Sequence, residues 1–206
     1  MTVALTVRQV AKREQIAKAA RKLFLESGYA GTSMDAVSAQ AGVSKQTLYT
    51  YFPTKVDLLK EIPTHALAGI PAGDGALPTL GSVADLRAVL QQFAHRLTGS
   101  LLHPDSLAMI RLVMGEAFRI PEVRDTVRDA VPVRALHAIS AIVDHADELG
   151  LITAPDPDLA ARMVLGPIMT YVAIDGFLQT EAVTPPTAAK LEQIVDYFLV
   201  MVAVTP

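Results

Sequence analysis

Small and apolar side chains recur at helical spacing from the start of the chain. Over residues 8–27 they occupy positions i, i+4, i+7, i+8 and i+11, which lie on one face of an α-helix. The stripe consists of Ile16, Ala20, Leu23, Phe24 and Ser27. Gly28 follows directly, and glycine is a common residue just past a helix C-terminus. The pattern predicts a first amphipathic helix over residues 8–27.

Capping residues and helix breakers predict three shorter helices next. Thr32 and Ser33 are N-cap residue types, and the small residues 41–43 end the short helix that they begin. Ser44 begins a third helix, which Pro53 ends by disfavouring the helical conformation of the residue before it. Thr54 then caps a fourth helix.

A stretch rich in glycine and proline, residues 69–78, is the clearest boundary in the chain. We expect one domain over residues 1–62 and a larger one over residues 63–206; a long loop within one domain is the alternative. Beyond the boundary the helical period continues, ending in two long apolar helices over residues 158–180 and 187–204. Alternating strands joined by a two-residue turn are not found. The sequence predicts an all-α fold.

Composition narrows the class of protein. The 206 residues fit a small module joined to a larger one, and 51% of them are apolar, enough to bury a core. The absence of cysteine excludes disulfide scaffolds, thiol nucleophiles and cysteine zinc sites. Charge or proline breaks each apolar run before about 18 residues, and the basic N-terminus lacks the apolar run of a secretory signal. We therefore expect a cytoplasmic protein without a membrane partner.

The net charge of −3 conceals an uneven distribution. Residues 1–60 contain nine lysines and arginines against four acidic residues, a charge of +5, which leaves −8 for the rest of the chain. Such a division indicates a module that faces a polyanion, attached to a body with another task. Chance variation between short segments is the alternative.

The basic module contains the pattern of a helix-turn-helix over residues 32–52. On its second helix Leu48 and Phe52 share one face, which must point into the core. The other side of this helix and its start carry polar side chains: Lys45, Gln46, Thr47, Tyr49 and Thr50. Such a set can hydrogen-bond to base edges and phosphates in the major groove of double-stranded DNA.

Two stretches in this region have a distinctive order of residues: FLESGYAGTS (residues 24–33) and AGVSKQTLYTYFPTKVDLL (residues 41–59). Together they resemble the DNA-binding domain of TetR-family transcriptional regulators, and the match covers about residues 12–62. The resemblance implies a three-helix DNA-binding module joined to a helical domain that binds a small molecule and forms a dimer.

The resemblance also implies roles for single residues. Lys45, Gln46 and Thr47 occupy positions that contact base edges. Positions near phosphates are occupied by Ser33, Ser44, Tyr49, Thr50, Tyr51 and Lys55. Three alternatives stay open. Tyr51 is equally compatible with packing, Lys55 with an ordinary solvated lysine, and Lys45 with a phosphate contact in place of a base contact.

The last two predicted helices carry more apolar side chains than one core-facing stripe needs. A helix with a second apolar face requires a second covering surface, which another copy of the chain supplies through a two-fold interface. The resemblance implies the same interface, because TetR-family proteins usually form a four-helix bundle from their last two long helices. A central position of these helices within the monomer is the alternative.

The resemblance further implies a small-molecule inducer inside the larger domain, whose binding changes the spacing of the two DNA-binding modules. We expect a pocket lined by flexible or aromatic side chains with a few polar groups that orient the ligand. The candidates are Phe93, Met109, Arg111, Met114, Phe118, Tyr171 and Asp175. For each of them an ordinary core or surface position is the alternative.

Enzyme signatures are missing from the sequence. The five histidines lack metal-ligand spacing, and neither a phosphate-binding glycine loop nor a G-x-S-x-G motif occurs. We expect no catalysis, metal or cofactor. The predicted function is sequence-specific regulation of transcription. In the TetR family the regulator is most often a repressor, which a small-molecule ligand releases from its DNA operator. A helical small-molecule sensor or carrier that no longer binds DNA is the alternative.

Overall fold

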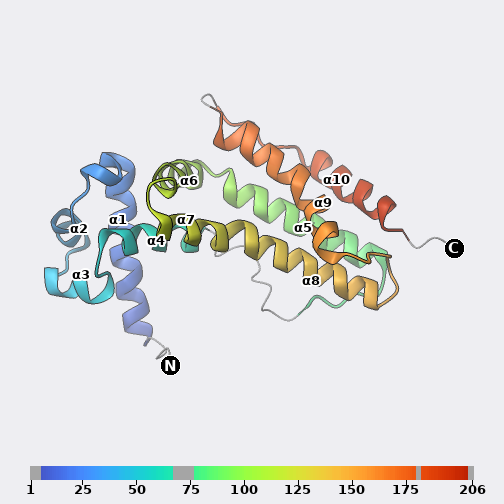
Figure 1. The fold of residues 1–206 in the computed structure, drawn as a ribbon, viewed down its shortest axis with the longest axis horizontal. Coiled ribbons are helices and arrows are strands. Elements are labelled where there is room, and N and C mark those ends of the chain that lie inside the picture. The colour runs from blue at the N-terminus through green and yellow to red at the C-terminus, as the bar shows by residue number, and fades with distance from the viewer. Residues whose placement is uncertain (1–5, 67–76, 180–181, 204–206) are drawn as a thin grey trace. The chain divides into compact units, whose positions relative to one another are not determined.

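The computed structural model describes residues 6–66, 77–179 and 182–203. Contacts divide the chain into two compact units. The N-terminal unit comprises Met1–His65 and Ala108–Val127, and the C-terminal unit comprises Ala66–Leu107 and Arg128–Pro206. Every regular element within the described ranges is a helix (Figure 1), which confirms the predicted all-α class.

The first helix, α1 (Val7–Gly31), begins at a capping box. The Thr6 side chain accepts a hydrogen bond from the Gln9 amide, and the Gln9 side chain accepts one of 2.8 Å from the Thr6 amide. The apolar face is buried and includes Phe24. Near the end Gly28 has a φ of 72°, in the left-handed region, so the predicted break at this glycine is confirmed, although helical hydrogen bonding continues beyond it.

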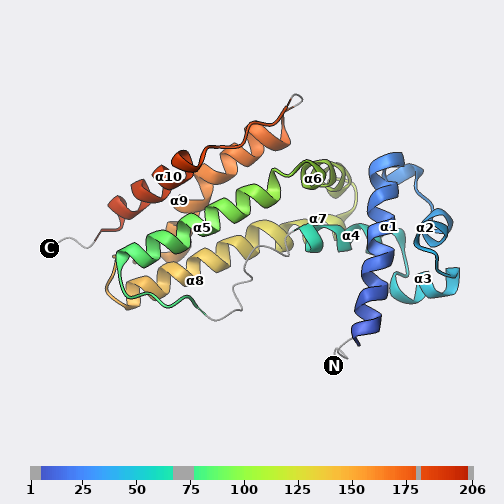
Figure 2. The same ribbon diagram turned by 180° about the vertical axis from the view of Figure 1, so that it is seen from behind.

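The helix-turn-helix consists of α2 (Met34–Ala41) and α3 (Lys45–Tyr51), which lie beside α1 (Figures 1 and 2). Ser33 and Ser44 are their N-caps, and each serine hydroxyl accepts a 3.1 Å hydrogen bond from an amide of the first turn. Between the helices Gly42 has a φ of 63°, which an L side chain adopts only under strain. The predicted caps and glycine break are confirmed.

Three more helices complete the N-terminal unit: α4 (Lys55–Ala66), most of α6 (Pro104–Ala117), and α7 (Pro121–Arg128). The core of the unit combines residues of α1–α4 with residues of α6 and α7. It includes Phe24, Val37, Leu48, Phe52, Leu58, Leu59, Met109, Val113, Ala117 and Val123. Burial of a leucine or phenylalanine side chain contributes about 1.5–3 kcal/mol, so this joint core stabilises the position of the helix-turn-helix in the unit.

The C-terminal unit is built from α5 (Val83–Leu101), α8 (Arg134–Glu148), α9 (Pro157–Thr170) and α10 (Ala188–Met201), with two π-helical segments, η1 (Asp129–Val133) and η2 (Tyr171–Phe177). The four α-helices lie alongside one another in both views (Figures 1 and 2). Contacts join α8 to α9 and α10 to both α5 and α9. Their facing side chains form a second apolar core, which includes Leu90, Ile139, Ile168 and Val195.

The described helices differ in places from the sequence prediction. The helix predicted over 158–180 is α9 followed directly by η2, and most of the glycine- and proline-rich segment 69–78 lies outside the described residues. The continuous helix Pro157–Phe177 is long and apolar enough, by length and composition alone, to cross a membrane, and 39% of its apolar window is buried. Asp158, Arg162 and Pro167 interrupt its apolar residues, as the sequence predicts, and one helix that meets this criterion is weak evidence for a membrane span.

Candidate nucleic-acid interface

The two sides of α3 have opposite character. Leu48 is fully buried in the core of the N-terminal unit, as is Phe52 just after the helix. The outer side carries the exposed side chains of Lys45, Gln46 and Tyr49. The helix therefore presents donors and acceptors of several kinds on a surface fixed by buried anchors, which is what contact with the edges of bases requires.

Hydroxyl groups on this surface hydrogen-bond within the helix-turn-helix. The Ser44 and Thr47 hydroxyls lie 2.8 Å apart, and the Thr50 hydroxyl donates to the Gln46 carbonyl at 2.8 Å. The Ser33 hydroxyl caps α2. A hydroxyl can donate one bond and accept two, so these groups keep capacity to accept further hydrogen bonds while they stabilise the helix ends.

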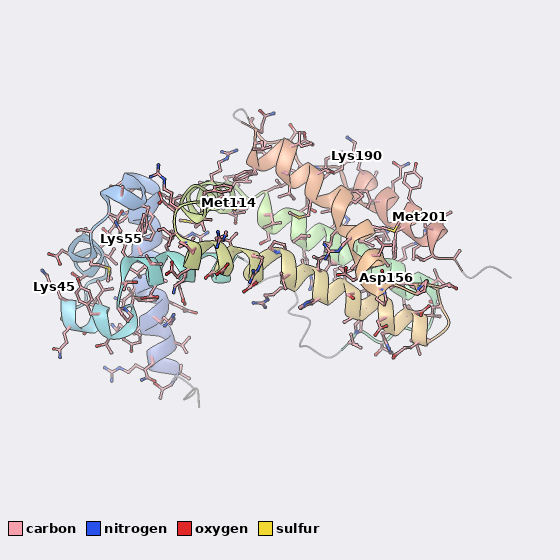
Figure 3. All side chains as sticks on the ribbon, in the orientation of Figure 1. Lys45, Lys55, Met114, Asp156, Lys190 and Met201 are labelled. Carbon is pink, nitrogen blue, oxygen red and sulfur yellow. The ribbon has the colours of Figure 1, made fainter. Side chains whose placement is uncertain are left out.

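An ion pair joins the first turns of α2 and α3. Lys45 Nζ lies 2.7 Å from Asp35 Oδ2, and the exposed fractions of the two side chains are 65% and 63%. The hydrogen bond to Asp35 raises the pKa of Lys45, and the negative charge of Asp35 adds to the shift. Figure 3 shows Lys45 on this surface. The sequence alone does not indicate that Asp35 belongs to this surface, because only the fold brings residues ten positions apart together here.

Lys55, the first residue of α4, has internal partners. Its Nζ donates to the carbonyl oxygens of Tyr29 at 2.8 Å and Thr32 at 2.9 Å, and it lies 4.3 Å from the centre of the Tyr29 ring. These carbonyls lie at the interrupted end of α1, where the Tyr29 carbonyl also accepts a hydrogen bond of 3.3 Å from the Thr32 amide. Lys55 therefore connects the end of α1 to α4. The sequence suggested either a phosphate contact or an ordinary solvated lysine, and neither includes this structural role. The phosphate contact of Lys55 stays a prediction.

The end of α3 is tied to α1 and α4 through Arg13. The guanidinium donates to both Glu61 oxygens, at 2.8 Å and 2.6 Å, and lies 4.6 Å from the centre of the Phe52 ring. It also donates to the carbonyl oxygen of Tyr51 at 3.5 Å. The hydrogen bond to Glu61 raises the pKa of Arg13. Tyr51 itself is half-buried, so packing and a phosphate contact are both compatible with its place.

Comparison with known proteins identifies the arrangement. The family described as bacterial regulatory proteins, tetR family, matches residues 16–62, and the AefR-like transcriptional repressor C-terminal domain matches residues 88–203, more than half of the chain. The chain belongs to the TetR family of transcriptional regulators. The sequence resemblance is thus confirmed, and this TetR-family protein combines a helix-turn-helix with a helical C-terminal part.

Relatives of the TetR-family chain are similar over different lengths. The HTH-type transcriptional regulator YhgD of Bacillus subtilis (strain 168) is 43% identical over 56 residues, which are 27% of this chain and 29% of YhgD. A TetR-family regulator from Mesorhizobium loti MAFF303099 is 26% identical, with a TM-score of 0.73, over 97% of this chain and all of that one. The flavonoid-responsive regulator FrrA is 25% identical, with a TM-score of 0.70, over 96% of this chain and all of FrrA.

The predicted ligand-binding residues of this TetR-family protein are divided between its two units. Met109, Arg111, Met114 and Phe118 belong to the N-terminal unit, while Phe93, Tyr171 and Asp175 belong to the C-terminal unit. Met109 is buried in the joint core, Arg111 is exposed, and Met114 is half-buried. Phe118 is 84% exposed. These four residues occupy ordinary core and surface positions in their unit, so their ligand contacts stay predictions.

In the C-terminal unit the other candidates lie on two helices. Phe93 is buried on α5, and Tyr171 and Asp175 are half-buried one turn apart on η2. Lys190 Nζ of α10 lies 5.6 Å from the centre of the Tyr171 ring. The structure thus places Tyr171 and Asp175 together on η2, and the ligand contacts of all three residues stay predictions.

Apolar side chains are exposed along the last two helical regions. Those on α9 and η2 are Leu159, Met163, Ile174 and Leu178, the last being the C-cap of η2. Those on α10 are Tyr197, Val200 and Met201. We call these seven residues the apolar face; Met201 is labelled in Figure 3. Such a surplus on a helix pair needs a covering surface. Among the described residues no group of three histidine or acidic side chains is placed to hold a metal ion.

Proposed function

We propose that this TetR-family protein is a transcriptional repressor that binds its DNA operator as a homodimer and is released by a small molecule. The DNA-binding domain in this proposal spans residues 1–62, and the ligand-binding and dimerisation domain spans residues 63–206. The observation that carries the proposal is the outer side of α3, which is polar and exposed directly above the buried anchors Leu48 and Phe52. A cytoplasmic location follows from the need to reach chromosomal DNA.

In this proposal α3 enters the major groove. Lys45, Gln46 and Thr47 in its first turn contact base edges, as residues at the start of a recognition helix do. Phosphates are bound by the hydroxyl, ammonium and backbone amide groups around it: Ser33, Ser44, Tyr49, Thr50, Tyr51 and Lys55. Phosphate contacts fix the register of the protein on the duplex, while the base contacts supply the sequence preference.

The dimer in this proposal forms through α9 and α10. Their apolar face is of the kind that an isologous interface buries, with each residue contacting the symmetry-related surface of the second copy. A two-fold dimer brings two recognition helices to half-sites about 34–36 Å apart. Each module then adds to the affinity of the other without any new contact.

The released state in this proposal depends on a ligand in the C-terminal domain. The matching family is named for a repressor, and the similar protein FrrA is named for its response to flavonoids. Phe93, Tyr171 and Asp175 supply aromatic and acidic groups for such a ligand, and the remaining candidates are Met109, Arg111, Met114 and Phe118. A ligand shifts the DNA-binding equilibrium only by its difference in affinity for the two states.

Fluorescence anisotropy tests the proposal on duplexes taken from either side of the protein's own gene. The full-length protein is titrated at two salt concentrations, with and without unlabelled competitor DNA. Binding that survives competitor supports a regulator, and its affinity is expected to fall steeply as salt rises, because phosphate contacts release counterions. Binding that competitor abolishes on every duplex, or no binding at low salt by refolded, ligand-free protein, contradicts the proposal and favours the sensor alternative.

A further inference from the structure

The ion pair between Asp35 and Lys45 places an acidic group on the surface that the proposed function directs at DNA. The carboxylate is 63% exposed and lies 2.7 Å from the ammonium group. It belongs to the first turn of α2, beside the first turn of α3, where base edges are contacted. A negative charge therefore lies on a surface that is proposed to face the polyanionic DNA.

An exposed carboxylate on a DNA-binding surface repels phosphates whatever the base sequence. It is compatible with tight binding only if a cation or a hydrogen-bond donor accompanies it. The donors in the major groove are the amino groups of cytosine (N4) and adenine (N6), so a carboxylate there can distinguish bases. Lys45 supplies the accompanying cation, which makes the pair electrically neutral as a whole.

We propose that Asp35 and Lys45 together recognise one G·C base pair in each half-site. Lys45 donates to both guanine O6 and N7 while its third proton stays on Asp35, and Asp35 accepts from the N4 amino group of the paired cytosine. The inference rests on the proposed DNA-binding function. Because the pair stays intact, one carboxylate oxygen holds Lys45 while the other is directed to the base.

The donor and acceptor order favours G·C over A·T. In the major groove guanine N7 and O6 are neighbouring acceptors, and the cytosine amino donor lies beside O6. An ammonium group next to a carboxylate matches that order with every polar group used. In an A·T pair the donor lies between two acceptors, so a single ammonium on one side of the carboxylate leaves one acceptor unmatched.

Neutrality of the pair separates this role from a simple phosphate contact. If Lys45 neutralised a phosphate, its removal would weaken binding to all sequences and lower the salt slope by about one. A base-pair contact instead changes the preference at one position. Lys45 and Asp35 would also act as a unit, so the second substitution would add little to the first.

The test selects duplexes from a library randomised over two half-sites, using the full-length chain. Four variants are compared with the parent: Asp35→Asn, Lys45→Met, the double variant, and Glu26→Gln as a control. Glu26 lies on α1 in another exposed ion pair, with Lys22, so its replacement removes one negative charge as Asp35→Asn does. The parent and the control are expected to select the same G·C pair in each half-site.

Asp35→Asn is expected to admit other base pairs at that position. Lys45→Met is expected to lose the preference for guanine, with affinity for the selected duplex reduced about tenfold or more. The double variant should resemble Lys45→Met. Thermal melting by circular dichroism checks that each variant folds. If the Asp35→Asn variant unfolds at a lower temperature than the parent, the Lys45→Met variant alone tests the inference. The exposed Lys45 side chain is not part of the core, so its replacement should leave the fold intact.

Three results overturn the inference. In the first, the parent selects a specific DNA sequence, but replacing Asp35 or Lys45 does not weaken its preference for a G·C pair at any position. In the second, Lys45→Met weakens all sequences equally and lowers the salt slope, which identifies a phosphate contact. Both leave DNA binding itself intact. In the third, the parent selects no sequence, which overturns the proposed function and the inference with it.

Discussion

Several basic side chains of the N-terminal unit hold partners within the protein. Lys55 donates to two carbonyls, Lys45 pairs with Asp35, and Arg13 binds both oxygens of Glu61. The charge of +5 over residues 1–60 therefore overstates the charge that is available to phosphates, because part of it is used inside the unit. The same contacts hold α3 in place before DNA is bound, which lowers the entropy lost on binding.

Lys55→Met separates the structural role of this residue from its predicted phosphate contact. The substitution keeps the aliphatic length but leaves the carbonyls of Tyr29 and Thr32 without their charged donor. Hydrogen bonds to charged groups contribute about 1.5–3 kcal/mol, so we expect a loss of unfolding free energy near the low end of this range. Urea denaturation measures it.

Lys60→Met is the matched control on the same helix. Lys60 Nζ lies 2.8 Å from Asp57 Oδ1 in a partly exposed pair, for which the expected loss is about 0–1 kcal/mol. If the Lys55 variant is as stable as this control but binds DNA more weakly, Lys55 acts mainly as a phosphate contact and the structural role assigned here is wrong.

The helix-turn-helix depends on one glycine in a conformation that other residues avoid. At Gly42 an added Cβ meets no atom within 4 Å, so the cost of Gly42→Ala is backbone strain alone, about 1–2 kcal/mol at a φ of 63°. Gly115 of α6 also has open space around an added Cβ but lies within a helix, so Gly115→Ala should stabilise by about 0.5–1 kcal/mol. Thermal unfolding should therefore shift in opposite directions; equal shifts would contradict the strain argument.

The start of α4 is a pH-sensitive element. Asp57 accepts hydrogen bonds from the Thr54 amide and hydroxyl, while the Thr54 hydroxyl accepts from the Asp57 amide. Hydrogen bonds from Lys60 and then Thr54 lower the pKa of Asp57 below 3.8. A lowered folded-state pKa means that the carboxylate stabilises the fold above the unfolded-state pKa and stops doing so as the pH falls through the folded-state value.

Asp57→Ala should therefore be less stable than the parent at pH 7, by about 1 kcal/mol for a lost cap. The difference should shrink once the pH falls below 3.8. Urea denaturation at a series of pH values measures the difference, with Asp57→Asn as the comparison that keeps an acceptor but removes the charge. A difference that stays constant down to acid pH would show that the ionised carboxylate contributes nothing.

Capping residues and glycine breaks predicted the first helices of the N-terminal unit. They did not predict which helices pack against one another when these are far apart in the sequence. Ser33, Ser44 and Gly42 act within one turn of their own position, so spacing along the sequence located the helices correctly. The placement of Met109 in the core of the N-terminal unit depends on a contact with helices more than forty residues away. No periodic pattern reports such a contact, because an apolar stripe shows that a face is covered and not what covers it.

The same limit applies to the interface. The exposed side of α3 follows from the spacing of Leu48 and Phe52, and the structure places both in the core. Asp35 and the carbonyl partners of Lys55 lie on other elements, and sequence alone does not show which exposed charges meet. Helical periodicity therefore identified the surface, while the charge pattern on it required the fold.

At the scale of the whole molecule, the apolar face of α9, η2 and α10 is the proposed dimer interface. Val200 is 76% exposed on α10, among apolar neighbours that include Tyr197 and Met201. Leu149 at the end of α8 is 48% exposed and lies outside this face, so it is a matched control in the same unit. A charge buried in an apolar dimer interface has no partner, whereas a charge on a solvent-exposed surface is hydrated.

Val200→Glu should therefore convert the dimer to a monomer, while Leu149→Glu should leave the dimer unchanged. Sedimentation equilibrium measures the mass of each variant, and anisotropy measures its affinity for the duplex that the parent selects. The monomer should keep the sequence preference of one half-site but bind far more weakly, because each module no longer raises the effective concentration of the other. If Val200→Glu stays dimeric and binds DNA normally, the interface does not include α10. Loss of affinity in a variant that is still dimeric would assign Val200 to the DNA-binding geometry of the dimer rather than to its assembly.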